Sequence, residues 1–190
     1  MNVELLPTTV REDLLLAFDM APVGLLVSRR RVVQSCNQAF TSMFGYSLGA
    51  LKGKSLACLY PSATEFEHIG DRALVVMRDK ARYSDERIMK RADGALFWCH
   101  VSGQTIDRND PFSAAVWAFE DISEKRPVTA DLTAREREIA QFLVMGKSSK
   151  EIGKLLDVGY RTVEAHRARL MRKFGVTSSN ELVARLVGRG

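Results

Sequence analysis

The sequence predicts an α+β protein: an antiparallel five-stranded sheet with helices, followed by an all-α domain of four helices. In residues 12–125, strand and helix patterns follow the order two strands, a helical stretch and three strands. In residues 131–190, four short helical patterns follow one another without a strand pattern. A chain of 190 residues has room for two small domains. We expect residues 1–11 to be an N-terminal extension and residues 126–130 a linker containing Pro127.

Alternation of apolar and polar residues places the strands and helices of residues 12–125. Polar turn residues, among them Asp93-Gly94 and Asp107–Pro111, separate the last three strands, which favours antiparallel pairing. The strands are predicted at Gly24–Ser28, Val32–Cys36, Tyr83–Lys90, Leu96–Gln104 and Ala114–Glu120, and the helices at Asp13–Asp19, Asn37–Phe44, Ser47–Leu51 and Thr64–Lys80.

Five segments of this region resemble the PAS sensor fold when they are taken in order. They read APVGLLV, CNQAFTSMFGYS, LKGKSL, RADGALFWCHVSG and VWAFEDIS, and they extend over about residues 12–125. The closing Asp121-Ile122-Ser123 is similar to the strand end that leads out of many PAS domains. The resemblance implies either a pocket for a ligand or cofactor between sheet and helices, or a domain that only dimerises.

Apolar residues on the inner face of the predicted sheet and on the facing helices are the candidates for lining such a pocket. Strand alternation gives the sheet residues a common face. The candidates are Phe40, Phe44, Met77, Phe97, Cys99, Val101, Trp117 and Phe119. The same residues could instead fill a packed core, so an apolar or aromatic ligand and a ligand-free core both stay open.

Flavin and haem are disfavoured as cofactors, and the cofactor stays unknown. Flavin-binding PAS domains carry a reactive cysteine where this chain has Leu56, and flavin-bonding amides where it has Cys99 and Phe119. Haem-binding PAS domains use a histidine on the long helix, and His68 lies too close to the start of that helix.

The positive charge of the chain is concentrated in its last third. Residues 1–126 hold 16 Lys and Arg and 16 Asp and Glu, whereas residues 127–190 hold 12 Lys and Arg and only 7 Asp and Glu. This asymmetry favours a polyanionic partner, because a basic surface that neutralises phosphates releases their counterions.

Capping residues divide residues 131–190 into four helices. Thr133 and Ser178 each precede a Glu at the third position and so form capping boxes, and Ser148 is a third cap. The segment Asp157-Val158-Gly159 interrupts the helical pattern between the middle two helices. Two short helices joined by about three residues are typical of a helix-turn-helix.

The same residues resemble the LuxR-type (GerE-like) DNA-binding domain from Leu132 to Val176. The matching features are Leu-Thr-x-Arg-Glu-x-Glu, Lys-Glu-Ile, Arg-Thr-Val-x-x-His and Lys-Phe-Gly-Val, at the expected spacing. The resemblance implies that residues 160–173 enter the major groove of double-stranded DNA. The candidate DNA-binding residues are Lys150, Arg161, Thr162, Glu164, Ala165, His166, Arg167, Ala168, Arg169, Arg172 and Lys173.

Two positions depart from the family pattern. Gly159 stands where the family often has a Ser cap, and Glu164 stands where a Lys is common. A glutamate cannot hold a phosphate but can accept a hydrogen bond from cytosine N4. Glu164 is equally well interpreted as a solvated helix position. His166 is expected to pack or face phosphate, because no second metal ligand lies at useful spacing.

The final helix and the leading apolar helix are the expected dimer contacts. LuxR-type domains pair through the final helix, and PAS proteins commonly dimerise through the segment before the first strand. The candidates are Leu15, Phe18, Leu182, Val183 and Leu186.

We therefore expect a cytoplasmic transcriptional regulator in which a PAS domain controls a LuxR-type helix-turn-helix and a homodimer binds a two-fold operator. The alternative is a PAS domain that binds no small molecule and only mediates protein contacts. RNA polymerase is a further expected partner.

No Gly-rich phosphate loop, metal-ligand cluster or nucleophile–base motif is recognised in the sequence, so we do not expect an enzyme. The three cysteines fit a reducing compartment, and no apolar run is long enough for a membrane span.

Overall fold

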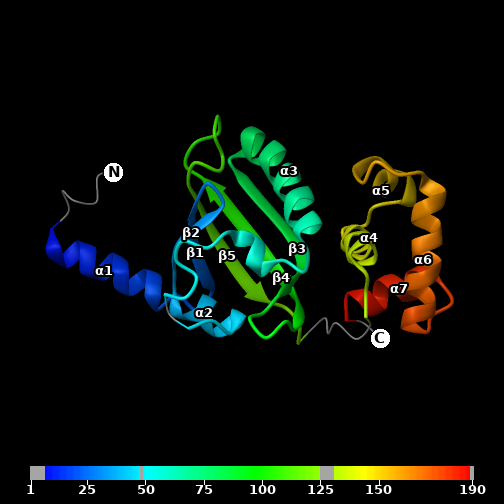
Figure 1. The fold of residues 1–190 in the computed structure, drawn as a ribbon, viewed down its shortest axis with the longest axis horizontal. Helices are drawn as coiled ribbons and strands as arrows, with labels where there is room; N and C mark the ends of the chain where they lie inside the picture. The colour runs from blue at the N-terminus through cyan, green and yellow to red at the C-terminus, as the bar shows by residue number, and fades with distance from the viewer. Residues whose placement is uncertain (1–6, 48, 125–130, 189–190) are drawn as a thin grey trace.

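The computed structural model describes residues 7–47, 49–124 and 131–188. It has a sheet domain and a helical domain, as the sequence predicts (Figure 1). The elements of the sheet domain are α1 (Thr8–Asp19), β1 (Gly24–Arg29), β2 (Val32–Cys36), α2 (Gln38–Phe44), η2 (Leu56–Leu59), α3 (Ala63–Lys80), β3 (Arg82–Lys90), β4 (Leu96–Thr105) and β5 (Ala115–Asp121). The helical domain has α4 (Ala134–Val144), α5 (Ser149–Leu155), α6 (Tyr160–Phe174) and α7 (Ser179–Leu186).

The five strands form one antiparallel sheet in the order β2-β1-β5-β4-β3. All five predicted strands are present, and each end lies within one residue of its prediction. The inner face of the sheet packs against α2, η2 and α3, and their apolar residues form the first core. Since β5 lies at the centre of the sheet, it pairs with β1 on one side and β4 on the other.

One predicted helix was wrong and one helical turn was missed. Ser47–Leu51 forms turns instead of a helix in its described residues, with the amide of Ala50 donating to the carbonyl of Ser47. Gly49 and Gly53 have φ of 83° and 80°, in the left-handed region that a right-handed helix cannot use. The short helix lies later, at η2, where the Ser55 side chain caps it.

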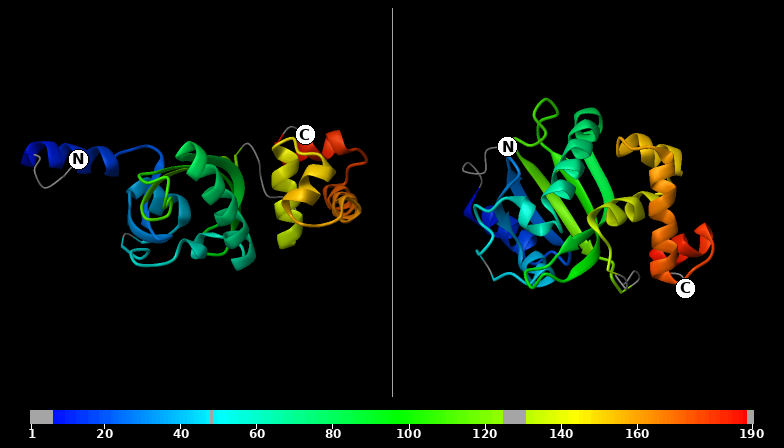
Figure 2. Two further views of the ribbon diagram at one scale, coloured as in Figure 1. Left: turned by 90° about the horizontal axis from the view of Figure 1, so that it is seen from above. Right: turned by 45° about the vertical axis from the view of Figure 1, so that its right-hand side comes forward.

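The N-terminal helix α1 is longer than predicted and lies away from the sheet. It begins at Thr8, so the predicted boundary between extension and domain falls inside this helix. In Figures 1 and 2 it extends away from the rest of the molecule, and none of its residues is buried. The predicted linker, residues 126–130, lies outside the described residues.

The capping boxes set the starts of three helices in the helical domain. The side chains of Thr133, Ser148 and Ser178 each accept from the backbone three residues later, and the Glu at that position bonds back. Apolar residues of all four helices form a second core with 0% exposure at Ile139, Ile152, Val163, Leu170 and Leu182. Of the described helices, none is long and apolar enough to cross a membrane.

The two domains contact each other through α3, α4 and the outer face of the sheet. Ile88 and Trp98 point away from the first core and join the apolar cluster of the helical domain. The Arg137 guanidinium donates to both carboxylate oxygens of Glu65, through Nε at 3.1 and 3.2 Å and Nη2 at 2.5 Å from Oε1. The side chains of Glu65 and Arg137 are only 5% and 11% exposed, so water screens this ion pair weakly.

Asn37 joins α1, β1 and α2 and is completely buried. Its Oδ1 accepts from the amides of Leu25 and Phe40, and its Nδ2 donates to the carbonyls of Phe18 and Val23 at 3.0 Å each. One side chain therefore both caps α2 and satisfies carbonyls at the end of α1 and the start of β1.

We expect Asn37→Ala to lower the free energy of unfolding of the sheet domain by about 2–4 kcal/mol, because buried donors and acceptors lose their partners. Asn37→Asp keeps the acceptor and loses the amide donors, so its cost should also be substantial. Urea unfolding followed by circular dichroism measures both. Asn109→Ala, on an exposed loop, is the control and should lie within about 0.5 kcal/mol of the unchanged protein. An Asn37→Ala protein as stable as this control would contradict the role of Asn37 in joining α1, β1 and α2.

Candidate nucleic-acid interface

Helices α5 and α6 form a helix-turn-helix with a close turn. A Cβ on Gly153 would lie 2.7 Å from the carbonyl oxygen of Val158, so only glycine allows this approach. Asp157 has φ of 51° and reverses the chain in the left-handed region. As predicted, Gly159 precedes α6 without a side-chain cap.

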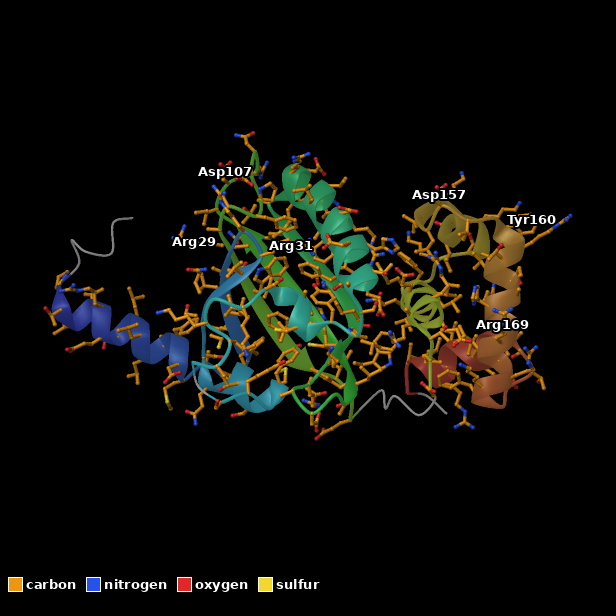
Figure 3. The ribbon with its side chains drawn as sticks, in the orientation of Figure 1. Arg29, Arg31, Asp107, Asp157, Tyr160 and Arg169 are labelled. Carbon is orange, nitrogen blue, oxygen red and sulfur yellow. The ribbon has the colours of Figure 1, made fainter. Side chains whose placement is uncertain are left out.

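Helix α6 buries a narrow stripe and exposes the rest of its surface. Val163 and Leu170 are 0% exposed and anchor the helix to the core. Tyr160 lies at the start of α6 and points away from the sheet domain (Figure 3). Eight of the predicted DNA-binding residues are classed as exposed: Lys150, Arg161, Thr162, Glu164, Ala165, Arg169, Arg172 and Lys173; His166, Arg167 and Ala168 are half-buried.

Arg167, one of the candidate DNA-binding residues, is held within the helical domain. Its Nη1 donates to Ser149 Oγ at 2.6 Å and its Nη2 donates to Ser179 Oγ at 2.6 Å. It also pairs with Glu164, whose side chain is 53% exposed, against 18% for Arg167. Arg167 thus joins α5, α6 and α7, which favours a structural role.

Lys173 is also held within the domain. Its Nζ donates to the Asp131 carbonyl and to Glu136 Oε2, both at 2.7 Å. Burial raises the pKa of Glu136, but hydrogen bonds from Lys173 and Thr133 outweigh it and hold that pKa below the ordinary value. The charge of Lys173 therefore stabilises the capping box of α4.

His166 is favoured in its neutral form. Burial and then the nearby charge of Arg169 lower its pKa. Its Nδ1 is buried and makes no hydrogen bond within the described part of the chain. This environment agrees better with a packed histidine than with a phosphate contact.

Two residues next to the interface, Tyr160 and Lys154, were missed by sequence reasoning. Tyr160 is 49% exposed at the start of α6, with the Arg161 guanidinium 6.0 Å from its ring centroid. Together with Lys150 and Lys154 it lines an open surface groove of about 520 Å³. An aromatic residue beside several cations was a usable signal, since such residues stack or contact sugar-phosphate chains.

The predicted dimer residues lie in two very different environments. Leu182 and Leu186 are 0% and 3% exposed in the core of their own domain, so they offer no side-chain surface to a second subunit. The final helix as a dimer contact stays a prediction, and of its three candidates Val183 is half-buried at the surface. Leu15 of α1 is 69% exposed, and Phe18 is half-buried.

The predicted pocket residues of the sheet domain form a close-packed aromatic core. The rings of Phe40 and Phe44 stack with centroids 4.5 Å apart, and Phe119 meets both rings edge-on. Phe97 packs edge-on against Phe44 at 5.2 Å. Of the predicted residues, only Val101, Trp117 and Phe119 border internal voids, each of about 20 Å³. Phe40, Phe44, Met77, Phe97 and Cys99 line neither void.

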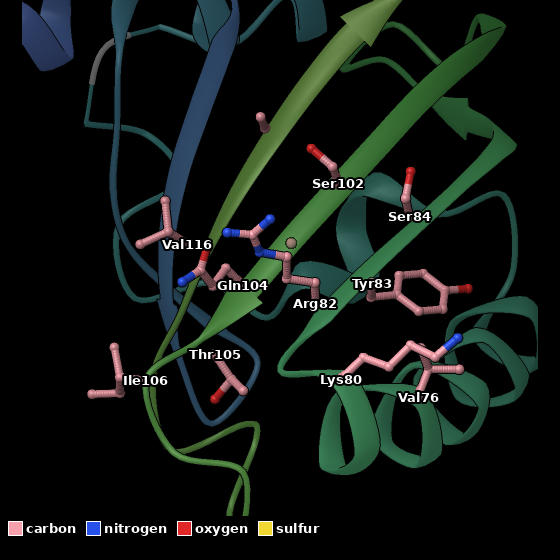
Figure 4. Close-up of a pocket in the computed structure, with 12 residues that line it drawn as sticks. Val76, Lys80, Arg82, Tyr83, Ser84, Ser102, Gln104, Thr105, Ile106 and Val116 are labelled. Atoms are coloured by element: carbon pink, nitrogen blue, oxygen red, sulfur yellow. The ribbon is translucent and has the colours of Figure 1, made fainter.

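A larger hollow of about 950 Å³ lies on the outer face of the sheet (Figure 4). Arg82, Ser84, Ser102, Gln104 and Val116 line it together with Val76 and Lys80 of α3. Its mixed lining and its position on the far side of the sheet distinguish it from the interior pocket that we expected.

Comparison with known proteins assigns both domains. A PAS domain family model matches residues 22–124, and the model described as bacterial regulatory proteins, luxR family, matches residues 130–186. The sensor protein TdiS of Thauera aromatica is 34% identical over 117 residues, covering 62% of this chain and 21% of the relative. The transcriptional regulatory protein TdiR of the same organism is 39% identical over 110 residues, covering 53% of this chain and 48% of the relative. The chain thus spans less than half of the length of either protein.

Solved structures agree with this assignment. The PAS domain of a LuxR-family transcriptional regulator from Burkholderia thailandensis, solved in complex with ethanol, is 46% identical with a TM-score of 0.56. The match covers 62% of this chain and 99% of that one. A VqmA dimer from Vibrio cholerae, a LuxR-type receptor, has a TM-score of 0.55 at 19% identity and covers 94% of this chain and 88% of its own, a likeness of fold. Because the PAS model matches more than half of the chain and the luxR model matches the domain that carries α4–α7, this protein belongs to the PAS-containing LuxR-type DNA-binding transcriptional regulators.

Proposed function

We propose that this regulator binds a two-fold DNA operator as a homodimer and that its PAS domain controls the DNA-binding domain through the contact between α3 and α4. The observation that carries the DNA-binding part is the exposed basic surface of α6, which the sheet domain leaves free (Figure 1). RNA polymerase is the further partner that we expect for such a regulator.

The exposed residues of α6 suit two kinds of DNA contact. Arg161, Arg169 and Arg172 can hold phosphates on either side of the groove, whereas Ala165 is small enough to let the helix approach base edges. Glu164 shares its exposed carboxylate with Arg167, so both the cytosine contact and the solvated position stay open for it.

We expect Arg161→Ala and Arg169→Ala to weaken binding to all DNA sequences similarly and to reduce the salt slope of the binding constant by about one each, because each removes one phosphate contact. Arg167→Met is the comparison variant, which removes an arginine of the same helix that is bonded within the domain. It should instead lower the free energy of unfolding of the helical domain by about 1–3 kcal/mol, since Ser149 and Ser179 lose a charged donor. Fluorescence anisotropy at several salt concentrations and urea unfolding separate the two effects. An unchanged salt slope for Arg161→Ala, or a stable Arg167→Met, would contradict this division.

An uncovered apolar helix supports the homodimer. α1 has no buried residue, and Leu14, Leu15 and Leu16 are 46%, 69% and 60% exposed. A helix of this length is marginally stable in water by itself, so we infer that a second copy of the chain covers it. The VqmA structure of the same fold is described as a dimer.

We expect Leu15→Glu to shift the sedimentation of the protein toward the monomer and to weaken binding to a two-half-site operator at least tenfold. A single half-site offers few base contacts, so loss of the second subunit removes much of the discrimination. Arg11→Glu places the same charge on the same helix without removing apolar surface, and it should stay dimeric. A dimeric Leu15→Glu protein would place the dimer contact elsewhere.

The contact between α3 and α4 gives the PAS domain a route to the DNA-binding domain. Glu65 and His68 of α3 hold Arg137 and Glu138 of α4, with 2.5 Å between His68 Nδ1 and Glu138 Oε1. Arg72 of α3 lies with its guanidinium 4.6 Å from the centroid of the Phe142 ring.

The neighbouring side of α3 faces the interior of the sheet domain. It places Phe66, Ile69, Ala73 and Met77 in the first core. A change of interior packing would therefore move the helix that holds α4. A small molecule is the signal that we favour, and the ethanol complex of the Burkholderia PAS domain supports it. The alternative, a PAS domain that only mediates dimer contacts, requires no such change.

We expect Glu65→Arg to separate the domains, because the reversed charge faces Arg137 in a buried contact. Small-angle scattering should show a larger radius of gyration, and the affinity for operator DNA should change at least severalfold. The double variant Glu65→Arg with Arg137→Glu restores opposite charges and should restore both readouts.

Arg78→Glu is the control on the exposed side of the same helix, because it also reverses a charge and the Arg78 side chain is exposed. It should leave the radius of gyration and DNA affinity unchanged. If Glu65→Arg separated the domains without altering DNA affinity, the contact would hold the domains together without controlling binding.

A further inference from the structure

We propose that Arg87 and Tyr60 anchor a binding site inside the PAS domain for a compact neutral molecule that has one hydrogen-bond acceptor oxygen, such as a small ketone, amide or alcohol, on an apolar body. This inference rests on the proposed sensing role and names its ligand class.

Arg87 is a buried cation inside the sheet domain, with 2% exposure. Its Nε donates to Asp85 Oδ1 and its Nη1 donates to Tyr60 Oη, both at 2.7 Å. Nη2 also lies against Asp85 as an ion pair, yet it makes no hydrogen bond of its own within the described residues. A guanidinium carries five N–H donors, so buried donor capacity is left over.

The acceptors around Arg87 are already in use. Asp85 receives Nε on one carboxylate oxygen and the Tyr83 hydroxyl on the other, at 2.8 Å. Tyr60 accepts from Arg87, which leaves its own O–H free to donate. The cluster therefore offers donors, and an acceptor atom is the group that would satisfy them.

The charge of the cluster favours a neutral acceptor. Burial lowers the pKa of Arg87, but the Asp85 carboxylate outweighs burial and raises that pKa above the ordinary value. The charge of Arg87 is thus compensated by its ion pair with Asp85. A carboxylate ligand would add an uncompensated buried charge, whereas a carbonyl or hydroxyl adds none.

Two voids border this cluster. Each has a volume of about 20 Å³, and Leu56, Tyr60, Arg87 and Trp117 border both. The first void is also lined by Leu59, Met89, Val101 and Phe119. The second is also lined by the apolar residues Phe66, Ile69, Ala73 and Phe112. These walls are apolar, so the body of the ligand is expected to be apolar as well.

The size of the voids determines how a ligand would enter. A volume of about 20 Å³ fits roughly one water molecule. A larger molecule must join the two voids by moving the wall between them. Trp117 is the bulkiest part of that wall, held by one hydrogen bond from Nε1 to Ser28 Oγ at 2.9 Å. Movement of Trp117 would therefore accompany binding.

The second void also connects the site to α3. Arg31 seals its edge: the guanidinium lies 3.4 Å from the centroid of the Phe66 ring and donates to the Phe66 carbonyl at 2.6 Å. Gly70 permits this approach, since a Cβ there would lie 2.5 Å from Arg31 Nη2. A ligand that widens this void would press on the helix that holds the DNA-binding domain.

The test uses proton–nitrogen correlation spectra of the full chain. The chain has two tryptophans, so two indole resonances are followed. Cyclopentanone and cyclopentane share a shape and differ by the carbonyl oxygen, and acetone and acetate have similar shapes and differ in charge. We expect cyclopentanone and acetone to shift the Trp117 resonance saturably, cyclopentane to bind at least tenfold more weakly, and acetate not to bind. Equal binding of cyclopentane, preference for acetate, or no shift with either ketone would each overturn the proposal.

Variants separate the anchor from the fold. Arg87→Met alone leaves Asp85 buried without a partner, so it is combined with Asp85→Asn, and this neutral pair should lose at least tenfold in ketone affinity. Met77→Leu lies in the same core, lines neither void and should bind as the unchanged protein does. Full ketone binding by the double variant would remove Arg87 from the site. Ketone binding without any change in DNA affinity would retain the site and contradict only the proposed control of DNA binding.

Discussion

The buried ion pair between Glu65 and Arg137 is the constraint on which the arrangement of the two domains depends. A buried charge without a partner is costly, so each residue is stable in this position only while the other domain supplies its counterion. The apolar contacts of Ile88 and Trp98 add area, but the bidentate pair fixes how α4 lies on α3. α3 borders the PAS core on one side and contacts α4 of the DNA-binding domain on another.

The helical domain divides its positive charge between two tasks. Arg167 and Lys173 are bound to serines, a carboxylate and a backbone carbonyl of neighbouring segments, and they hold the four helices together. Arg161 and Arg169 are exposed and remain available to a polyanion. Some cations of α6 therefore help to position the helix that carries the others.

The PAS core contains an aromatic part and a polar part with different properties. Phe40, Phe44 and Phe119 pack ring against ring, as expected for a close-packed interior. The polar part around Arg87 and Tyr60 has internal voids and spare donors. A buried polar cluster that is only partly satisfied contributes little to stability, so its presence is better explained by binding.

The sequence by itself determined both fold classes, the order of the strands along the chain and the starts of the four helices of the helical domain, because periodicity, turn residues and capping boxes such as Thr133–Glu136 act between near neighbours. It also located the basic helix α6. Only the tertiary structure decided which arginines are free, that Leu182 and Leu186 are core residues, and that Arg87 lies inside the sheet domain. These properties depend on contacts between residues far apart in the chain, such as Arg137 with Glu65, and such contacts cannot be predicted from a local sequence pattern.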